Sequence, residues 1–241
     1  MKIILNGANG RMGRAITDLV AELSDAEIVF KADVDAPIEN APHDADVIVD
    51  FSLPSSLPSL LKFAKSAKTP LVLATTGYSE EQLNQIQSAG NEVAILQSAT
   101  MSIGINILMD LAAKVTQILQ NDFDVEIIEK HHNKKLDAPS GVALAIANRV
   151  ADAKNSESEF VYCREEVRKE RDLKEIGIHS VRGGSIIGDH SVMFAGMDEV
   201  LEIKHHAGSR KIFAAGAIRA ARFMVGKAKG LYSMKDVLVL D

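Results

Sequence analysis

The chain of 241 residues is poor in several residue types, and each shortage excludes a class of protein. It contains one cysteine and no tryptophan, and aromatic residues make up 5% of it. One cysteine cannot form an internal disulfide, which fits a reducing cytoplasm. The net charge of −6 and the few aromatic rings argue against a nucleic-acid partner, which requires a basic face or stacking rings. No apolar run is long enough to span a bilayer, so we expect a cytoplasmic protein without a membrane partner.

A glycine-rich turn near the N-terminus predicts a dinucleotide-binding site. Apolar residues 3–5 lead into Gly7-Ala8-Asn9-Gly10-Arg11-Met12-Gly13, and the helical spacing of apolar residues from 16 to 23 follows. Glycine lets the chain bend tightly and lets a pyrophosphate approach the backbone. A second apolar strand, 27–32, leads to Asp33-Val34-Asp35, where we expect Asp35 to hold the ribose hydroxyls. The alternative is a glycine-rich turn in an ordinary parallel sheet that binds no nucleotide.

Apolar strands alternate with helices through the first hundred residues. We expect strands at 47–51, 71–74 and 93–96, with helices at 52–68 and from the capping box Ser79–Gln82. This alternation predicts an α/β fold with a Rossmann-type parallel sheet. Ligands bind beyond the carboxyl ends of such strands. The segments expected to line one crevice are therefore Gly7–Met12, Asp35, Phe51-Ser52, Ala74–Gly77 and Ser98–Met101.

The pattern changes beyond residue 102. A long helix, 104–119, precedes predicted strands at 124–129, 160–164, 177–181, 191–195 and 199–205, and a helix at 212–225 follows. Strands without regular helices between them predict a C-terminal α+β domain with a mixed or antiparallel sheet, one face of which is used for oligomerisation. We expect a dinucleotide-binding domain at 1–102, completed by 213–241, and a substrate-binding and oligomerisation domain at 103–212. Cys163 continues the alternation of 160–163, so we expect a buried structural thiol.

The densest chemistry lies in residues 129–141, Glu-Lys-His-His-Asn-Lys-Lys-Leu-Asp-Ala-Pro-Ser-Gly. An apolar helical pattern follows, with Ser140 placed as its N-cap, so a cationic loop runs into a helix N-terminus that favours a carboxylate or phosphate. Two alternatives for His131 and His132 are a structural imidazole pair and a metal site. Adjacent histidines on an extended chain point apart, and no further ligand lies at the right spacing, so we expect no metal.

These segments resemble one family over the whole chain. The matching motifs are the glycine turn 7–13, Asp50-Phe51-Ser52, Thr75-Thr76-Gly77, Ser102–Asn106, Glu129–Gly141, Val181–Gly184, Gly188-Asp189-His190, Ser209-Arg210 with Phe213-Ala214, and Gly230–Met234. The chain resembles the 4-hydroxy-tetrahydrodipicolinate reductase (dihydrodipicolinate reductase) family. The resemblance implies an oxidoreductase that reduces a cyclic imine dicarboxylate with NADH or NADPH in the diaminopimelate and lysine pathway. It also implies a Rossmann domain and a sheet domain that assembles a homotetramer.

The resemblance assigns roles to individual residues. It implies that His131 is the proton donor and Lys135 its partner, and that substrate carboxylate is held by His132, Ser140, Gly141 and Val142. The implied cofactor-binding residues are Gly7, Ala8, Asn9, Gly10, Arg11, Met12, Asp35, Phe51, Ala74, Thr75, Thr76, Ser98, Ala99, Thr100 and Met101.

The sequence departs from the family pattern at four of these positions. Ala74 replaces a usual glycine, Thr100-Met101 replaces an asparagine and an aromatic residue, and Val142 replaces a threonine. A decayed enzyme would lose such contacts first, which keeps a non-enzymatic redox-sensing or cofactor-binding module in view. Another small dehydrogenase, acting on an amino-acid aldehyde, is a further alternative.

The acid after the second strand also bears on cofactor choice. Asp35 accepts hydrogen bonds from a ribose diol and repels a 2′-phosphate, and Ala36 supplies no compensating cation. We therefore expect NADH to be preferred, with NADPH as the alternative if Lys31 or Arg11 compensates.

Overall fold

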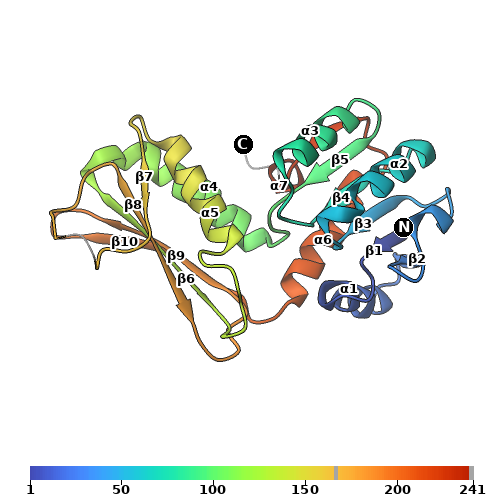
Figure 1. Cartoon of the computed structure of the whole chain (residues 1–241), viewed down its shortest axis with the longest axis horizontal. Coiled ribbons are helices and arrows are strands. Elements are labelled where there is room, and N and C mark those ends of the chain that lie inside the picture. The colour runs from blue at the N-terminus through green and yellow to red at the C-terminus, as the bar shows by residue number, and fades with distance from the viewer. Residues whose placement is uncertain (166–167, 239–241) are drawn as a thin grey trace. The chain divides into compact units, whose positions relative to one another are not determined.

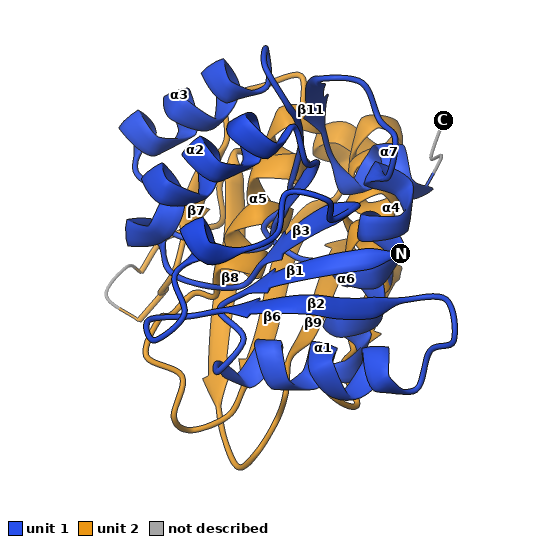
Figure 2. Cartoon of the chain, turned by 90° about the vertical axis from the view of Figure 1, so that its right-hand side faces the viewer, with its two compact units in different colours: residues 1–103, 210–241 blue, residues 104–209 orange. Residues whose placement is uncertain are grey.

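The computed structural model describes residues 1–165 and 168–238 and divides the chain into two compact units. Unit 1 consists of residues 1–103 and 210–241, and unit 2 of residues 104–209 (Figure 2). The final residues of the predicted tail, 239–241, lie outside the described residues. None of the helices in the two described ranges has the length and apolar character that a bilayer crossing requires.

Unit 1 is built on a six-stranded sheet in the order β11-β5-β4-β3-β1-β2 (Figure 1). The strands are β1 (Lys2–Asn6), β2 (Glu27–Ala32), β3 (Val47–Asp50), β4 (Leu71–Leu73), β5 (Ala94–Gln97) and β11 (Gly230–Tyr232). All neighbouring pairs are parallel, which confirms the predicted α/β class. The strands β3 and β4 are buried along their whole length, as expected of apolar strands covered on both faces.

Helices cover both faces of this sheet. They are α1 (Arg11–Ala21), α2 (Leu57–Ala67), α3 (Glu80–Ala89), α6 (Lys211–Met224) and α7 (Met234–Leu238). Residues of α1, α6 and α7 share one buried cluster with Ile3 and Leu5, whereas residues of α2 and α3 share another with Ile4 and Ile48. Successive residues of β1 therefore point to opposite faces. The capping box of Ser79 and Gln82 is present, as predicted.

Unit 2 is a five-stranded sheet in the order β10-β9-β6-β8-β7, with two helices on one face (Figure 1). Its elements are α4 (Ile103–Leu119, of which Ile103 belongs to unit 1), β6 (Asp124–His131), α5 (Gly141–Ala153), β7 (Glu159–Val161), β8 (Glu175–Arg182), β9 (Asp189–Ala195) and β10 (Val200–His206). The pairs β6–β8 and β7–β8 are parallel, and β6–β9 and β9–β10 are antiparallel. The predicted mixed sheet is therefore confirmed.

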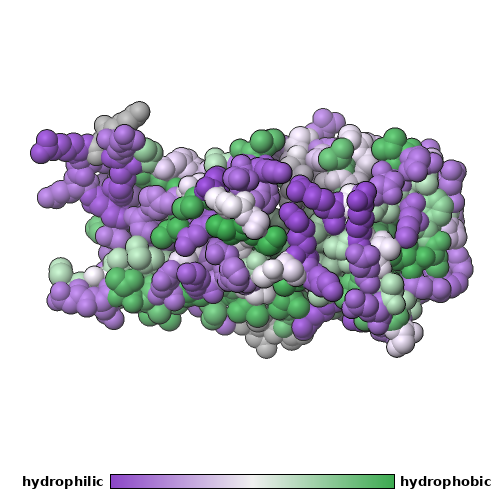
Figure 3. Space-filling model, turned by 90° about the horizontal axis from the view of Figure 1, so that it is seen from below, coloured by the Kyte–Doolittle hydropathy of each residue, from purple (hydrophilic) through white to green (hydrophobic). Residues whose placement is uncertain are grey.

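The two faces of this sheet differ in character. On the helix-covered face Val125, Ile127 and Phe194 pack with α4 and α5 in one buried cluster. On the second face lie the alternate residues of the same strands, including Glu126, Lys130 and Met193, which are only partly buried. The space-filling view shows hydrophobic side chains exposed in patches among hydrophilic ones on one side of the molecule (Figure 3).

The prediction of a buried thiol at Cys163 is wrong, because the structure places this side chain at the surface. The strand β7 ends at Val161, two residues before the cysteine, so the alternation of 160–163 does not continue as a strand. A short apolar alternation is weak evidence for burial when the strand that carries it has only three residues.

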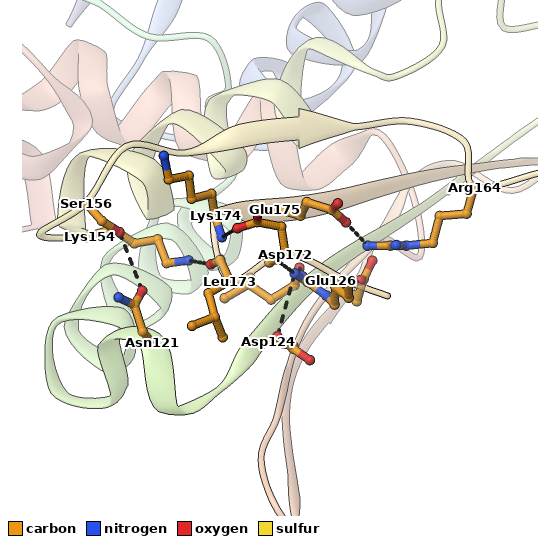
Figure 4. A network of polar contacts seen from close by, with 12 residues as sticks. Asn121, Asp124, Glu126, Lys154, Ser156, Arg164, Asp172, Leu173, Lys174 and Glu175 are labelled. Atoms are coloured by element: carbon orange, nitrogen blue, oxygen red, sulfur yellow. Dashed lines mark hydrogen bonds and ion pairs between the residues drawn. The ribbon is translucent and has the colours of Figure 1, made fainter. Parts of the chain in front are cut away.

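A polar network anchors the segment that leads into β8 (Figure 4). Glu175 is buried and pairs with Arg164 and, at 3.3 Å, with Lys169. The ammonium of Lys154 donates to the carbonyl oxygen of Leu173 at 2.8 Å. The guanidinium of Arg171 donates to Glu126 on β6 at 3.2 Å.

Candidate active site

Unit 1 contains a pocket of about 540 Å³ at the carboxyl ends of β1, β2 and β3. Its lining residues are Asn6, Gly7, Asn9, Gly10, Asp33, Val34, Pro37, Ile38, Glu39, Phe51, Ser52, Leu53, Ser55, Ser56 and Ser59. Gly7 has φ +79°, and a Cβ there would lie 2.6 Å from the carbonyl oxygen of Phe51, so only glycine fits this turn. A glycine turn that enters a helix beside such a pocket suits a dinucleotide.

Of the acids in the segment Asp33–Asp35, Asp33 lines the pocket. It directly follows β2, and its Oδ2 accepts a hydrogen bond from the amide of Asn9 at 2.8 Å. Asp35 accepts a hydrogen bond from Asn9 Nδ2 at 3.3 Å and is not among the described lining residues. Asp33 is also about twenty residues past Gly13, so the expected spacing between the glycine turn and the ribose-binding acid fits Asp33 as well as Asp35.

The pocket brings together only some of the predicted cofactor residues. Gly7, Asn9, Gly10 and Phe51 line it. The other predicted residues do not line it among the described residues: Ala8, Arg11, Met12, Asp35, Ala74, Thr75, Thr76, Ser98, Ala99, Thr100 and Met101. Sequence reasoning missed Glu39 and the serines at 55, 56 and 59, for which no motif gave a signal.

A buried carboxylate, Asp50, ties three strand ends together beside this pocket. Its Oδ1 accepts from Asn6 Nδ2 at 2.8 Å and from Ser52 Oγ at 2.6 Å, and its Oδ2 accepts from Thr75 Oγ1 at 2.7 Å. Burial raises the pKa of Asp50, and the three side-chain hydrogen bonds oppose that rise. The hydroxyl group of Thr75 therefore helps to hold the carboxyl ends of these strands together.

Residues at the Thr100 turn are mostly buried. Met101 lies in the apolar cluster shared with α6, and Ser102 N–H donates to Thr100 Oγ1 at 3.2 Å. Thr100 and Met101, two of the departures from the family pattern, therefore lie in the interior of unit 1 and do not line the pocket described above.

In unit 2 the N-terminus of α5 has the predicted form. Ser140 is the N-cap, and its Oγ accepts a hydrogen bond from the amide of Ala143 at 3.1 Å. The amides of Gly141 and Val142 have no hydrogen-bond acceptor among the described residues. These two N–H groups point out of a thirteen-residue helix, where the dipole favours an anion.

The strand β6 runs two residues further than predicted and ends at His131, so Glu129 and His131 share its helix-covered face. Glu129 is fully buried, and Arg182 donates to both of its carboxylate oxygens at 2.7 Å. His131 Nδ1 lies 2.6 Å from Glu129 Oε2, and the amide of Ser140 donates to Oε1 at 3.1 Å. Burial opposes ionisation, yet the hydrogen bonds from Arg182 and His131 outweigh it and lower the pKa of Glu129 to about 2.

His131 and His190 lie edge to face, with ring centroids 5.3 Å apart. Burial lowers the pKa of His131, and the neighbouring Glu129 carboxylate opposes that shift. Burial, and then the charge of His131, lower the pKa of His190 to about 4. The Nε2 atom of His190 lies 3.2 Å from Ser140 Oγ, so the histidine pair contacts the N-cap of α5. Sequence reasoning missed Glu129, Arg182 and His190 as parts of this site.

The remaining predicted residues lie on the loop between β6 and α5. The ammonium of Lys135 pairs with Asp137 Oδ1 at 2.8 Å and is largely covered, whereas Lys134 is exposed. His132 Nδ1 is buried and has no hydrogen-bond partner among the described residues. Within residues 1–165 and 168–238 no group of three His, Cys, Asp or Glu side chains is arranged to hold a metal ion.

Comparison with known proteins identifies relatives over the whole chain. Residues 1–101 match the family described as "Dihydrodipicolinate reductase, N-terminus", and residues 104–238 match "Dihydrodipicolinate reductase, C-terminus". The 4-hydroxy-tetrahydrodipicolinate reductase of Clostridium tetani is 47% identical over 99% of this chain and 97% of that protein. The reductase of the same name from Brachyspira hyodysenteriae is 44% identical over 99% of this chain and 100% of that protein.

A solved structure shows the same fold. It is described as "Dipicolinate bound Dihydrodipicolinate reductase from Paenisporosarcina sp. TG-14", with a TM-score of 0.76, 23% sequence identity and coverage of 98% of each chain.

Proposed function

The chain belongs to the dihydrodipicolinate reductase family, and we propose that it reduces 4-hydroxy-tetrahydrodipicolinate to tetrahydrodipicolinate with a nicotinamide cofactor, in the diaminopimelate and lysine pathway. Unit 1 binds the cofactor, and unit 2 binds the cyclic substrate. The observation that carries this proposal is the N-terminus of α5, where two amides with no acceptor among the described residues follow the loop that bears His131 and Lys135.

Unit 2 holds the substrate through its carboxylates. The amides of Gly141 and Val142 are donors for one carboxylate, and the Val142 amide serves this role whatever its side chain. His132 supplies a further donor, and Ser140 keeps the helix start in place because its hydroxyl accepts from Ala143. The methyl groups of Val142 replace a hydroxyl contact, so we expect weaker substrate binding than a threonine would give.

The reaction also requires a proton. When bound, the reduced cofactor supplies a hydride to a ring carbon, and the displaced electron pair needs a proton at the neighbouring carbon. His131 and Lys135 are the donors, since an imidazole and an ammonium both carry a transferable proton near neutral pH. A carboxylate bound at the start of α5 competes with Asp137 for the ammonium of Lys135.

Loss of NADH absorbance with freshly made cyclic substrate tests this function. We expect Lys135→Ala to lower kcat by at least ~10²-fold, as for a lost general acid, and to leave cofactor affinity nearly unchanged. Lys134→Ala is the matched control, because its ammonium is exposed next to the same site. Unchanged turnover in Lys135→Ala would remove Lys135 from the mechanism, and a wild-type protein without activity would refute the function.

For the cofactor we propose a preference for NADH. Two acids, Asp33 and Glu39, line the pocket of unit 1, and its described lining contains no lysine or arginine, so a 2′-phosphate would meet only negative charge. The ratio of kcat/KM for NADH to that for NADPH should therefore exceed one and should fall in Asp33→Ser. The variant Asp35→Ser shows whether Asp35 contributes to the cofactor preference as Asp33 does. A large NADPH advantage in the wild type would contradict the proposal.

We further propose that the enzyme works in the cytoplasm as a homotetramer. The second face of the unit 2 sheet supports assembly, because it mixes partly buried apolar side chains such as Met193 with charged ones, and Val181 and Val200 are exposed nearby. Sedimentation equilibrium should give four times the chain mass, whereas a monomer at micromolar concentration would exclude this assembly.

A further inference from the structure

Among the described residues, the carboxylate of Glu129 is held within unit 2 through both of its oxygens, and a hydrogen bond with the Ser180 side chain also lowers its pKa. Oε1 accepts from Arg182 Nη2 at 2.7 Å and from the Ser140 amide at 3.1 Å. Oε2 accepts from Arg182 Nη1 at 2.7 Å and lies 2.6 Å from His131 Nδ1. An ionised carboxylate has only lone pairs to offer, so the hydrogen of the contact with His131 belongs to Nδ1.

We propose that Glu129 is a positioning residue for the reaction: it fixes the His131 ring with a proton on Nδ1 and so presents Nε2 as the nitrogen that delivers the proton to the substrate. This inference rests on the proposed role of His131 as a donor. Glu129 would then act in the reaction and not only stabilise the interior of unit 2 through its ion pair with Arg182.

The surroundings of Nε2 agree with this assignment. A Cβ at position 188 would lie 3.1 Å from His131 Nε2, so the glycine there keeps a side chain off that nitrogen. The His190 ring covers the imidazole edge to face. Nδ1 is therefore fixed by a carboxylate, whereas Nε2 is bordered by a residue that has no side chain.

The charged groups around His131 set when it holds two protons. Burial lowers its pKa, Glu129 on the same strand raises it, and Lys135 and Arg182 lower it again. His190, from β9, is neutral near pH 7 because its own pKa is about 4. In the transfer, the imidazolium gives its Nε2 proton to the substrate carbon, whose electron pair forms the new C–H bond. The ring returns to the neutral form with Nδ1–H on Glu129, and solvent later restores the Nε2 proton.

Glu129→Gln tests the assignment because an amide has one acceptor and one donor end. With its oxygen toward Ser140 and Arg182 Nη2, the glutamine meets one donor–donor clash, at Arg182 Nη1; the reverse orientation creates two. The amide NH₂ therefore faces His131 Nδ1, and the ring should change to the Nε2–H tautomer. The ¹⁵N shifts of labelled histidine report this directly, with His131→Asn used to assign the signals.

We expect wild-type protein to show Nδ1–H and Glu129→Gln to show Nε2–H. The variant's kcat should fall by about 10²-fold with substrate KM within about twofold, and the high-pH limb of its kcat profile should move to lower pH, because the carboxylate that raised the pKa of His131 is gone. Glu126→Gln is the matched control, since Glu126 pairs with His179 at 2.8 Å from the other face of β6 and should leave the His131 signals in place.

An Nε2–H tautomer in the wild type, or an unchanged tautomer in Glu129→Gln, would overturn the inference. The wild-type spectrum alone decides the first point if the variant does not fold. A changed tautomer with unchanged kcat would show that Glu129 orients the ring but that His131 is not the donor, which would refute the proposed role of His131 and with it the positioning role.

Discussion

The two faces of the unit 2 sheet carry the same three side-chain types in different surroundings. On the helix-covered face the side chains of Glu129, His131 and Arg182 are 0%, 11% and 20% exposed. On the second face those of Glu126, His179 and Arg171 are 15%, 42% and 17% exposed. We call these sets the inner and the outer cluster.

The difference lies in the carboxylate and the histidine rather than in the arginine. Water cannot replace a hydrogen-bond partner of a fully buried carboxylate, so each of its partners is fixed. A partly exposed carboxylate can exchange a partner for water at little cost in free energy. The same ionic trio therefore orients a side chain when it is enclosed and is an ordinary ion-pair group when it reaches the surface. The following substitutions test that contrast.

The largest difference should appear when each cluster loses its arginine. Arg182→Met leaves the Glu129 charge buried without its main partner and should lower the free energy of unfolding by about 3 kcal/mol. Arg171→Met leaves Glu126 with His179 and access to water, so we expect a loss of about 1 kcal/mol. Urea unfolding followed by circular dichroism measures both. Equal losses would show that the two clusters are energetically alike.

Acid should lower the stability by somewhat less than the loss of Arg182 does. His190, which packs against the inner cluster, has a folded-state pKa of about 4, below its ordinary 6.5. The unfolded chain then binds more protons between these values, so the free energy of unfolding falls as pH drops from 6.5 to about 4, by roughly 2–3 kcal/mol from this residue.

Replacing that histidine should remove its share of the effect and leave a smaller slope from His131 and His205, whose pKa values burial also lowers. His190→Gln should therefore reduce the fall in stability over this pH window, whereas His179→Gln, in the outer cluster, should retain the wild-type slope. Urea titrations at four pH values between 4 and 7 measure the slopes. A wild-type slope in His190→Gln would mean that another group carries the acid sensitivity.

The smallest expected effect is on kcat, when a methyl group fills the space beside His131 Nε2 in the inner cluster. In Gly188→Ala the new methyl group would lie 3.1 Å from His131 Nε2, so we expect about tenfold lower kcat with little change in stability. Gly183→Ala, in the same connection between β8 and β9, meets no atom within 4 Å and is the control. Equal kinetics in the two variants would mean that Nε2 needs no open space.

Local patterns in the sequence predicted most of the fold. The glycine turn, the capping box of Ser79 and the N-cap Ser140 were correct because each depends on residues within one turn of a helix. The strand β7 was predicted too long, through Cys163 and Arg164, because the edge of a sheet is set by pairing with β8 and not by local alternation.

The site was predictable only where its residues are close in sequence. The segment 129–141 predicted His131, Lys135 and Ser140 as site residues, but the link from Glu129 to Arg182 joins residues 53 apart through the register of β6 and β8. That register places His131 opposite Arg182, which no local pattern reveals. Likewise, spacing alone indicated an acid after β2, whereas the geometry of the turn places Asp33 at the pocket.

The order of the two units along the chain has a consequence for synthesis. Unit 2 is a single stretch, residues 104–209, so all of it has been made before the ribosome reaches the last thirty residues. Unit 1 still lacks β11, the neighbour of β5, and the helix α6 that completes one of its apolar clusters. During translation the nascent Rossmann sheet therefore keeps an unpaired edge at β5 and a partly uncovered face until α6 and β11 have been made. Both are exposed to chaperones and to aggregation until then.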